Sequence, residues 1–290
     1  MTPTSNAAGR PTPVPFGIRL REKVSQRGPL CVGIDPHPSL LKAWGLSDDA
    51  CGLDAFASTV VGALAGQVAV LKPQSAFFER HGSAGIAVLE RVIEVARAAE
   101  TLVLLDAKRG DIGSTMAAYA EYLDPGHPLA VDAMTVSPYL GFASLAPAVS
   151  AAQTYGGGLF VLARTSNPEG GQVQLAGSST GASVAQQVID AVGALNADSS
   201  PDGSVGVVIG ATLQRLDVDI SSLGGPVLSP GLGAQGGDPV HLRQLFGGYA
   251  GLVLPSSSRE ILRHGPDLGA LRSAARTVAD DLAGRVSREV

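Results

Sequence analysis

The chain has few cysteines and no excess of positive charge. Only Cys31 and Cys51 are present, which is too few for a disulfide framework and favours a reducing, cytoplasmic location. The net charge of -5 argues against a nucleic-acid-binding protein, because such proteins usually carry a basic face. The 5 histidines show no spacing typical of metal ligands. We therefore expect no metal site and no nucleic-acid partner.

Long apolar runs are also missing. No segment approaches the roughly 18 apolar residues that a membrane span requires, so we expect no membrane partner. Residues 1–15 are rich in Pro and Thr and lack the apolar segment of a signal peptide, and we expect them to be a disordered extension. Residues 16–290 contain no linker-like stretch, so we expect them to form one catalytic domain.

Hydrophobic patterning predicts short apolar segments that alternate with amphipathic ones. The expected strands are 30–34, 68–71, 102–108, 130–136, 158–163, 205–209, 226–228 and 251–254. The expected helices are 16–27, 54–67, 84–100 with Ser83 as its N-cap, 114–122, 141–153, 179–195, 241–246 and 266–289. Strands that are apolar on both faces indicate a parallel sheet covered by helices. Eight such units favour an α/β fold with a single (β/α)8 TIM barrel.

The third expected strand ends in a concentration of charge. Its sequence, LVLLDAKRGDIGST, places Asp106, Lys108 and Asp111 close together. Side chains alternate along a strand, so Asp106 and Lys108 point to the same face. A salt bridge that closes the strand would account for this pair alone. Asp111 adds more negative charge than pairing requires, which favours acid–base chemistry in an active site.

Other strands also end in polar residues. The full set is Asp35, Lys72, Asp106, Lys108, Ser137, Arg164, Ser166, Ser229 and Ser256. In a barrel the carboxyl ends of the strands meet at one mouth, where active sites are found. We expect these side chains to be neighbours there.

A glycine-rich loop, SPGLGAQGGDP, follows the seventh expected strand. Its G-x-G-x-x-G pattern is not a dinucleotide fingerprint, because no acidic residue ends the next strand. Two interpretations remain: a flexible turn, or a set of backbone N–H groups that binds an anion. Arg259, in the first turn of the next helix, favours the second, because a cation there opposes the helix dipole unless it shares an anion. We expect a phosphorylated substrate.

In order along the chain, GIDPHP, LKPQSAFFE, LLDAKRGDIGST, SPYLG, GVVIGAT, SPGLGAQGGD and SSSREI resemble segments of the orotidine 5'-phosphate decarboxylase family, in particular its longer bacterial branch. The resemblance runs from about Phe16 to the last helix. It implies decarboxylation of orotidine 5'-monophosphate (OMP) to UMP in de novo pyrimidine biosynthesis, without a metal or organic cofactor, by a cytoplasmic homodimer.

The resemblance also implies catalytic roles. Lys108 would protonate C6 of the pyrimidine, and Asp106 would lie near the substrate carboxylate. Lys72 would bridge the ribose and the acidic network. Asp111 would reach into the neighbouring subunit's site.

Further residues would bind the substrate. They are Asp35 at the ribose hydroxyls, Thr115 at the ribose across the dimer, Ser166 at the pyrimidine edge, and Gln235 and Arg259 at the phosphate. Thr165 and Asn167 are alternatives to Ser166, and the role of Gln74 stays open.

Two other functions fit part of this pattern. The D-x-K-x-x-D motif is shared with magnesium-dependent phosphosugar decarboxylases and aldolases, although SPYLG, KPQ and SSSRE favour a pyrimidine nucleotide. A non-catalytic nucleotide-binding barrel is the second alternative. Binding alone would not need the charge density of residues 106–111.

Overall fold

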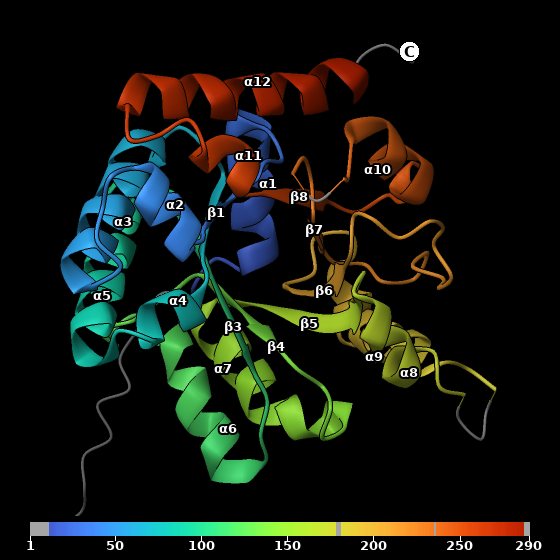
Figure 1. Cartoon of the computed structure of the whole chain (residues 1–290). Helices are drawn as coiled ribbons and strands as arrows, with labels where there is room; N and C mark the ends of the chain where they lie inside the picture. Colours follow the sequence, from blue (N-terminus) through green and yellow to red (C-terminus); the bar gives the residue numbers. More distant parts are fainter. Residues whose placement is uncertain (1–11, 178–180, 235, 287–290) are drawn as a thin grey trace, which may run out of the picture.

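The protein is a closed barrel of eight parallel strands, each hydrogen-bonded to the next in chain order (Figure 1). The computed structural model describes residues 12–177, 181–234 and 236–286. The strands are β1 Cys31–Ile34, β2 Val70–Pro73, β3 Leu102–Arg109, β4 Ala133–Val136, β5 Gly158–Arg164, β6 Val205–Ile209, β7 Val227–Pro230 and β8 Val253–Ser257. The predicted single (β/α)8 barrel is therefore confirmed.

Helices cover the outside of the barrel. The longer ones are α1 Phe16–Arg27, α3 Ala50–Leu64, α5 Gly82–Ala98, α6 Gly113–Ala120, α7 Ala146–Tyr155, α9 Val184–Asn196, α10 Pro239–Phe246 and α12 Leu268–Val286. Short helices α2 Pro38–Ala43, α4 Ser75–Glu79, α8 Gly171–Gln174 and α11 Arg259–Leu262 lie in strand-to-helix connections, and short 3-10 segments complete the chain. Among the residues that the structure describes, no helix is long and apolar enough to cross a membrane.

Alternation along the strands separates two apolar clusters. Residues such as Val70, Leu104 and Phe160 belong to the smaller cluster, and their neighbours Leu71, Leu105 and Val161 belong to the larger one, together with residues of the covering helices. This division is the period of two of a β-strand, with one set facing the barrel axis and the other the helices. Polar residues that continue the inward set, such as Lys72 after Val70 and Asp106 after Leu104, emerge at the mouth.

Helix α1 closes the opposite end of the barrel. Phe16 packs edge-on against Phe160 with ring centroids 6.0 Å apart. A Cβ on Gly158 would stand 2.3 Å from the Phe16 ring, so only glycine fits there. Arg19 forms an ion pair with Asp132, which also accepts a hydrogen bond from the Val103 amide. Helix α1 thus closes one end of the barrel, and the carboxyl ends of the strands lie at the other end.

Several local predictions differ from the structure. Helix α5 begins at Gly82 after His81, so the prediction that Ser83 is its N-cap is wrong. Helices α2, α4 and α8 were not predicted, because segments this short cannot show a helical period, whereas α11 begins at Arg259 as predicted. Residues 1–11 and 287–290 lie outside the described residues. The predicted disorder of 1–15 stays a prediction.

The pairing of β3 with β4 is irregular near the mouth. Leu105 pairs with Met134, whereas Arg109 pairs with Val136, so the register shifts between these two points. Bulges of this kind redirect side chains and often lie next to active sites. Here the shift falls on Asp106 and Lys108.

Candidate active site

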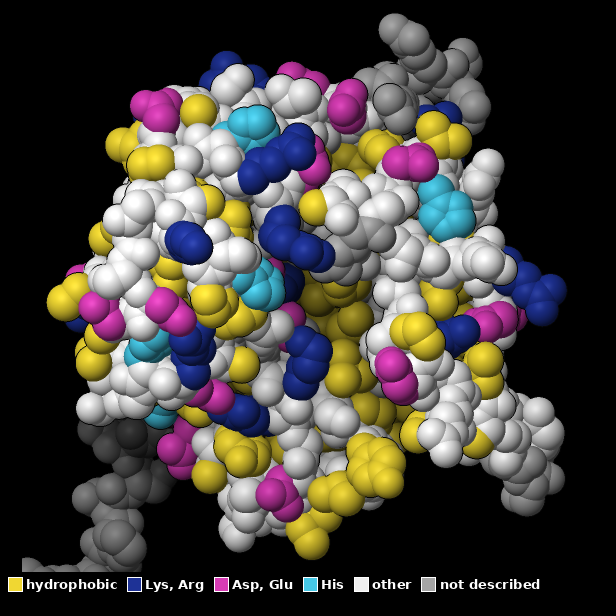
Figure 2. Space-filling view, in the orientation of Figure 1, with side chains coloured by type: hydrophobic (Ala, Val, Ile, Leu, Met, Phe, Trp, Pro, Cys, Tyr) yellow, Lys and Arg dark blue, Asp and Glu magenta, His cyan; other side chains and the backbone are white. Residues whose placement is uncertain are grey.

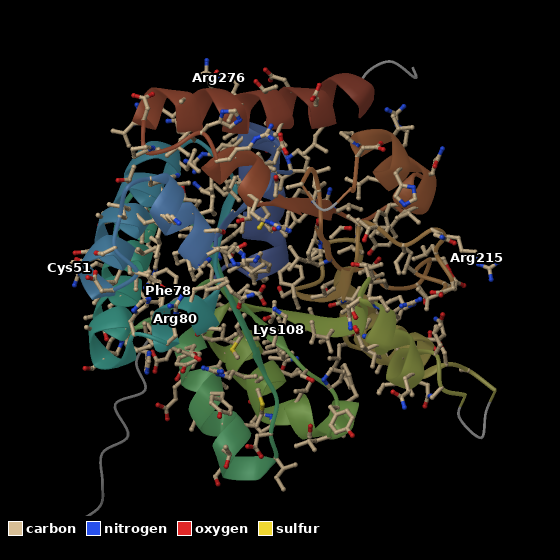
Figure 3. All side chains as sticks on the ribbon, viewed as in Figure 1. Cys51, Phe78, Arg80, Lys108, Arg215 and Arg276 are labelled. Carbon is tan, nitrogen blue, oxygen red and sulfur yellow. The ribbon has the colours of Figure 1, made fainter. Side chains whose placement is uncertain are left out.

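A cavity of about 310 Å³ opens at the carboxyl ends of the strands. Figure 2 shows it as a hollow with basic side chains along one side and hydrophobic ones at its floor. It is lined by Asp35, His37, Lys72, Gln74, Asp106, Lys108, Leu162, Thr165, Ser166, Asn167, Val208, Gly210, Pro230, Gly231, Leu232, Ala234, Ser256, Ser258 and Arg259. Lys108 lies near the centre of the view in Figure 3, whereas Cys51, Arg215 and Arg276 lie at the periphery.

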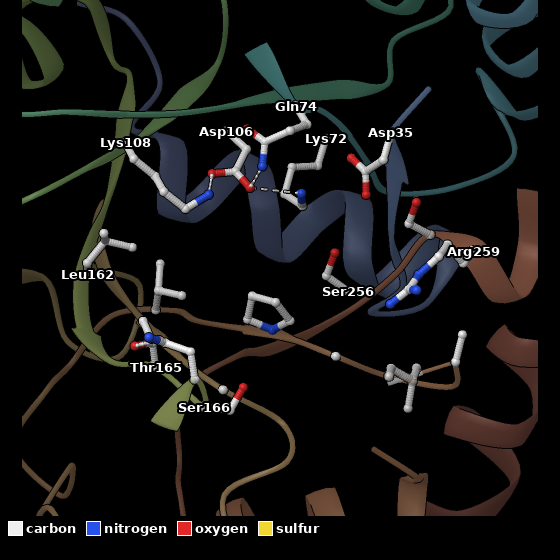
Figure 4. A pocket seen from close by; sticks show the side chains of 18 of the residues that line it. Asp35, Lys72, Gln74, Asp106, Lys108, Leu162, Thr165, Ser166, Ser256 and Arg259 are labelled. Atoms are coloured by element: carbon white, nitrogen blue, oxygen red, sulfur yellow. Dashed lines mark hydrogen bonds and ion pairs between the residues drawn. The ribbon is translucent and has the colours of Figure 1, made fainter. Parts of the chain in front are cut away.

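Asp106 is the centre of the hydrogen-bond network in this cavity. Its Oδ2 accepts from Lys72 Nζ at 3.1 Å and from Gln74 Nε2 at 3.0 Å. Its Oδ1 accepts from Lys108 Nζ at 2.6 Å and from Thr135 Oγ1 at 2.9 Å. The first three of these bonds are drawn in Figure 4. The predicted convergence of Lys72, Asp106 and Lys108 is confirmed, and Gln74 takes a place in the same network.

Burial makes these charges interdependent. Lys72 is 5% exposed and Asp106 is 7% exposed. Burial by itself would raise the pKa of Asp106, but the ammonium groups of Lys72 and Lys108 lower that pKa well below its usual range. Burial would lower the pKa of Lys72, but Asp106 and Asp35 raise it above its usual range. Both groups are therefore charged at neutral pH, although little of either is exposed to solvent.

The opposite side of the cavity carries groups without partners. Asp35 Oδ1 and Ser258 Oγ are buried and make no hydrogen bond among the described residues. Arg259 lines the cavity, is exposed and has no ion-pair partner in the described part of the chain. Gly231 and Gly233 in the loop after β7 have φ of +111° and +80°, a region that glycine adopts readily. This side can accept a polar, anionic ligand.

The loop after β5 carries the three candidates for contact with the pyrimidine edge, Thr165, Ser166 and Asn167. They differ in whether the side chain is already hydrogen-bonded. Thr165 Oγ1 donates to Asn167 Oδ1 at 2.6 Å and accepts from Gln174 Nε2 at 2.7 Å. Asn167 Nδ2 donates to Glu169 at 3.0 Å. Ser166 makes no side-chain hydrogen bond to any described residue, and it lines the cavity. A Cβ on Gly210 would lie 2.7 Å from Ser166 Cβ, so a glycine gives Ser166 its place.

Some predicted members of the mouth lie elsewhere. Arg164 turns away and binds Asp217, with Nε 3.0 Å from Oδ1. Ser229 is fully buried and belongs to the helix-facing set, because the inward positions of β7 are Leu228 and Pro230. Ser137 does not line the cavity. For these three residues the prediction was wrong. Ser229 has the outward parity of β7, Arg164 follows a register shift between β5 and β6, and Ser137 lies beyond the end of β4.

Two further candidates do not line the cavity of this chain, and a third lies outside the described residues. Asp111 is half-buried, and its Oδ1 accepts a hydrogen bond from the next amide, of Ile112, at 2.8 Å. Thr115 is exposed on α6. Gln235 lies outside the described residues.

Sequence reasoning missed two residues that the structure places at the site. His37 lines the cavity and stacks edge-on against Phe77, with ring centroids 4.4 Å apart. Thr135 was missed because it lies within an apolar strand and carries no charge. Its position two residues after Ala133 of the inward cluster was the available signal. Among the described residues no group of His, Cys, Asp and Glu is arranged to hold a metal ion.

Comparisons with known proteins agree with the fold. A family model described as "Orotidine 5'-phosphate decarboxylase / HUMPS family" matches residues 28–274. An orotidine 5'-phosphate decarboxylase of Salinispora arenicola is 59% identical over 267 residues, which cover 92% of this chain and 96% of the relative. One of Streptomyces coelicolor is 58% identical over 269 residues, or 92% and 97% of the two chains.

A solved structure from Streptomyces avermitilis, described as a candidate orotidine 5'-phosphate decarboxylase, has a similar fold. It superposes with a TM-score of 0.91 at 55% identity, covering 96% of this chain and 98% of that one.

Proposed function

The chain belongs to the orotidine 5'-phosphate decarboxylase / HUMPS family, and from that premise we propose how its cavity works. Its activity is the decarboxylation of OMP to UMP in pyrimidine biosynthesis, the reaction of a carboxy-lyase. The observation that supports our assignment of the reacting group is the contact of 2.6 Å between Lys108 Nζ and Asp106 at the centre of the cavity. Lys108 is the proton donor.

Loss of carbon dioxide leaves an electron pair on C6 of the pyrimidine. The C6–carboxylate bond breaks, and the ammonium group of Lys108 supplies the proton that forms the new C6–H bond. A fixed cation next to the developing negative charge also stabilises the transition state. Lys108 becomes neutral and regains a proton from solvent.

The neighbouring charges prepare this step. Asp106 holds Lys108 in its charged form and stands close to the place of the substrate carboxylate, so that this carboxylate faces a like charge before it is lost. Lys72 balances Asp106 and, with Asp35, binds the ribose hydroxyls. The buried and unpaired Asp35 Oδ1 supports this role, because it lacks a partner in the described chain.

The remaining groups recognise the two ends of the nucleotide. Ser166, whose hydroxyl is free, contacts the pyrimidine edge. Arg259 and Gln235, the latter from the loop after β7, bind the phosphate. The phosphate is remote from the reacting carbon, so its binding energy can be used to close the site and exclude water.

A homodimer completes the site. Asp111 and Thr115 do not line the cavity of their own chain, and the loops beside them expose Ile112 (63%), Tyr139 (78%) and Leu140 (53%). Exposed apolar groups of this kind mark interaction surfaces. Asp111 and Thr115 then enter the partner's site. The expected cytoplasmic location stays a prediction, which the free thiols of Cys31 and Cys51 suit.

The test is the ultraviolet absorbance of OMP after addition of the purified protein in the presence of EDTA. We expect conversion to UMP that needs no metal, and a loss of at least about 10⁴-fold in kcat in Lys108→Ala. Lys42→Ala, which removes an exposed lysine of α2, is the control and should keep full activity.

Two outcomes would change the conclusion. Activity on a phosphosugar that magnesium restores would indicate the metal-dependent relatives. Tight UMP binding without any conversion would indicate a nucleotide-binding barrel.

A further inference from the structure

Thr135, in β4, makes hydrogen bonds to both residues at the centre of the site. Its side chain is buried, with 1% of the residue exposed. Oγ1 donates to Asp106 Oδ1 at 2.9 Å and accepts from the backbone amide of Lys108, also at 2.9 Å. A hydroxyl can donate and accept at once, so a single oxygen joins the Asp106 carboxylate to the Lys108 main chain.

This oxygen lies at the register shift between β3 and β4. Between the pairs Leu105–Met134 and Arg109–Val136, the segment 106–108 stands opposite Thr135 alone. Lys108 has a φ of +47°, which residues with a side chain rarely adopt. Such a conformation persists only where the surroundings hold it, and it clusters at functional sites.

The bulge determines where the lysine points. It turns Lys108 back over the strand, so that Nζ lies 2.6 Å from Asp106 Oδ1. The hydrogen bond from the Lys108 amide to Thr135 is the interaction that holds the backbone in this form, because the shifted register leaves that amide opposite the Thr135 side chain. Without the hydroxyl, the amide and Asp106 each lose a partner.

We propose that Thr135 is a positioning residue for the decarboxylation: its hydroxyl sets the distance and direction from Lys108 to the reacting carbon by holding the bulge and the Asp106 carboxylate together. This inference rests on the proposed role of Lys108 as proton donor. Thr135 does not line the cavity and does not touch substrate. Its effect therefore appears in turnover and not in binding.

The experiment compares four variants. Thr135→Val keeps the shape of the side chain and removes the oxygen, and Thr135→Ser keeps the oxygen. Thr101→Val is the matched control: Thr101 is also 1% exposed, and its Oγ1 accepts from the Gly66 amide at 2.7 Å and from Arg27 Nη1 at 3.2 Å, at the far end of β3. Thr135→Ala tests the same oxygen if the valine variant does not fold.

We expect Thr135→Val to lower kcat for OMP roughly 10- to 100-fold, the scale of a displacement of about 1 Å in a catalytic group. The dissociation constant for UMP should change by no more than about threefold, because UMP lacks the carboxylate and needs no proton. Thr135→Ser should restore kcat to within about threefold of the wild type. Thr101→Val should lower the melting temperature and leave kcat unchanged.

Three results would overturn the inference. They are wild-type kcat in Thr135→Val, no recovery in a folded Thr135→Ser, or an equal loss of kcat in Thr101→Val. Lys108→Ala, measured in parallel, separates the two claims. Full activity in Lys108→Ala would contradict the proton donor itself, whereas loss there with full activity in Thr135→Val would contradict the positioning role alone.

Discussion

Asp106 and Lys72 each keep the other in its charged form. Two ions this deeply buried would each be neutral if alone, because removing a single charge from water is costly. Paired at 3.1 Å, each shifts the pKa of the other towards the charged form. Beneath them, burial raises the pKa of Cys31 to about 12, so this thiol adds no charge to the site.

The stability of the fold should therefore depend on pH through Asp106. A carboxyl whose pKa is lowered on folding stabilises the protein above its unfolded pKa of about 3.9, and this contribution is lost as the pH falls below that value. The raised pKa of Lys72 acts in the opposite sense: its contribution is present below about pH 10.4 and is lost as the pH rises further. Between about pH 5 and pH 9 both are constant.

We expect Asp106→Asn to have a smaller loss of melting temperature between pH 5 and pH 3 than the wild type. Each kcal/mol of lost linkage corresponds to about 2–4 °C. Thermal unfolding followed by circular dichroism across this pH range measures the slope. Asp198→Asn, at an exposed position, should keep the wild-type slope. Parallel curves for Asp106→Asn and the wild type would contradict the link between the charge of Asp106 and the stability of the fold.

A second prediction concerns the proposed binding of the phosphate by Arg259. If it binds the phosphate, Arg259→Ala should raise the activation free energy given by kcat/KM for OMP by about 1.5–3 kcal/mol, the scale of a hydrogen bond to a charged group. The same variant should match the wild type on orotidine, which has no phosphate. Arg263→Ala, four residues on and paired with Glu260, is the control. An equal loss on both substrates would assign Arg259 another role.

Among the elements, the ends of β2 and β3 determine the site, because they carry Lys72 and Lys108. The short helix α4 begins directly after Gln74, and its last residue, Glu79, forms an ion pair with Arg109 at the end of β3. Ser75 Oγ also donates to Glu79, and the Arg109 guanidinium lies 5.3 Å from the centre of the Tyr119 ring. This pair fastens the two strand ends to each other.

A double-mutant cycle of Arg109→Gln and Glu79→Gln tests that link. We expect each single variant to lower kcat, with a coupling energy of about 0.5–3 kcal/mol between the two positions. The kcat of the double variant should be no lower than that of the less active single variant. The neighbouring surface pair of Arg80 and Asp48, at 2.7 Å, is the control, with coupling of at most about 1 kcal/mol and no effect on kcat. Arg80 is labelled in Figure 3. Additive effects of Arg109 and Glu79 would rule out the link.

At the scale of the whole molecule, the barrel supplies most of the site but leaves Asp111 and Thr115 outside it. Figure 2 shows hydrophobic side chains gathered at the lower edge of the molecule. A dimer related by a twofold axis would present each of these loops to the other subunit. One chain alone would then hold an incomplete site.

Mixing two inactive variants under subunit exchange tests this arrangement. In a heterodimer of Lys108→Ala and Asp111→Ala, a shared site places both mutations in one cavity and neither in the other. We expect about a quarter of wild-type activity after random exchange, since half the dimers are mixed and each has one intact site. The control is each variant exchanged with itself, which should stay inactive. Absence of recovery in the mixture, with dimers present, would contradict the shared site.

The sequence by itself determined the class of fold and the identity of the central charges. Eight apolar segments were visible because each is a short strand buried on both faces, and D-A-K on the third was visible because alternation is a local property. Helix α1 and strand β6 were predicted with the bounds that the structure has. All of these follow from patterns within one segment.

The tertiary structure alone decided which strand-end residues meet. Ser229 and Arg164 turned away, because the parity and register of a strand depend on its neighbours in the closed sheet. Thr135 acquired its role for the same reason: it stands opposite a bulge in β3, and a register shift is a relation between two strands that neither segment encodes alone. Local patterns in the sequence predict elements, whereas long-range pairing determines their contacts.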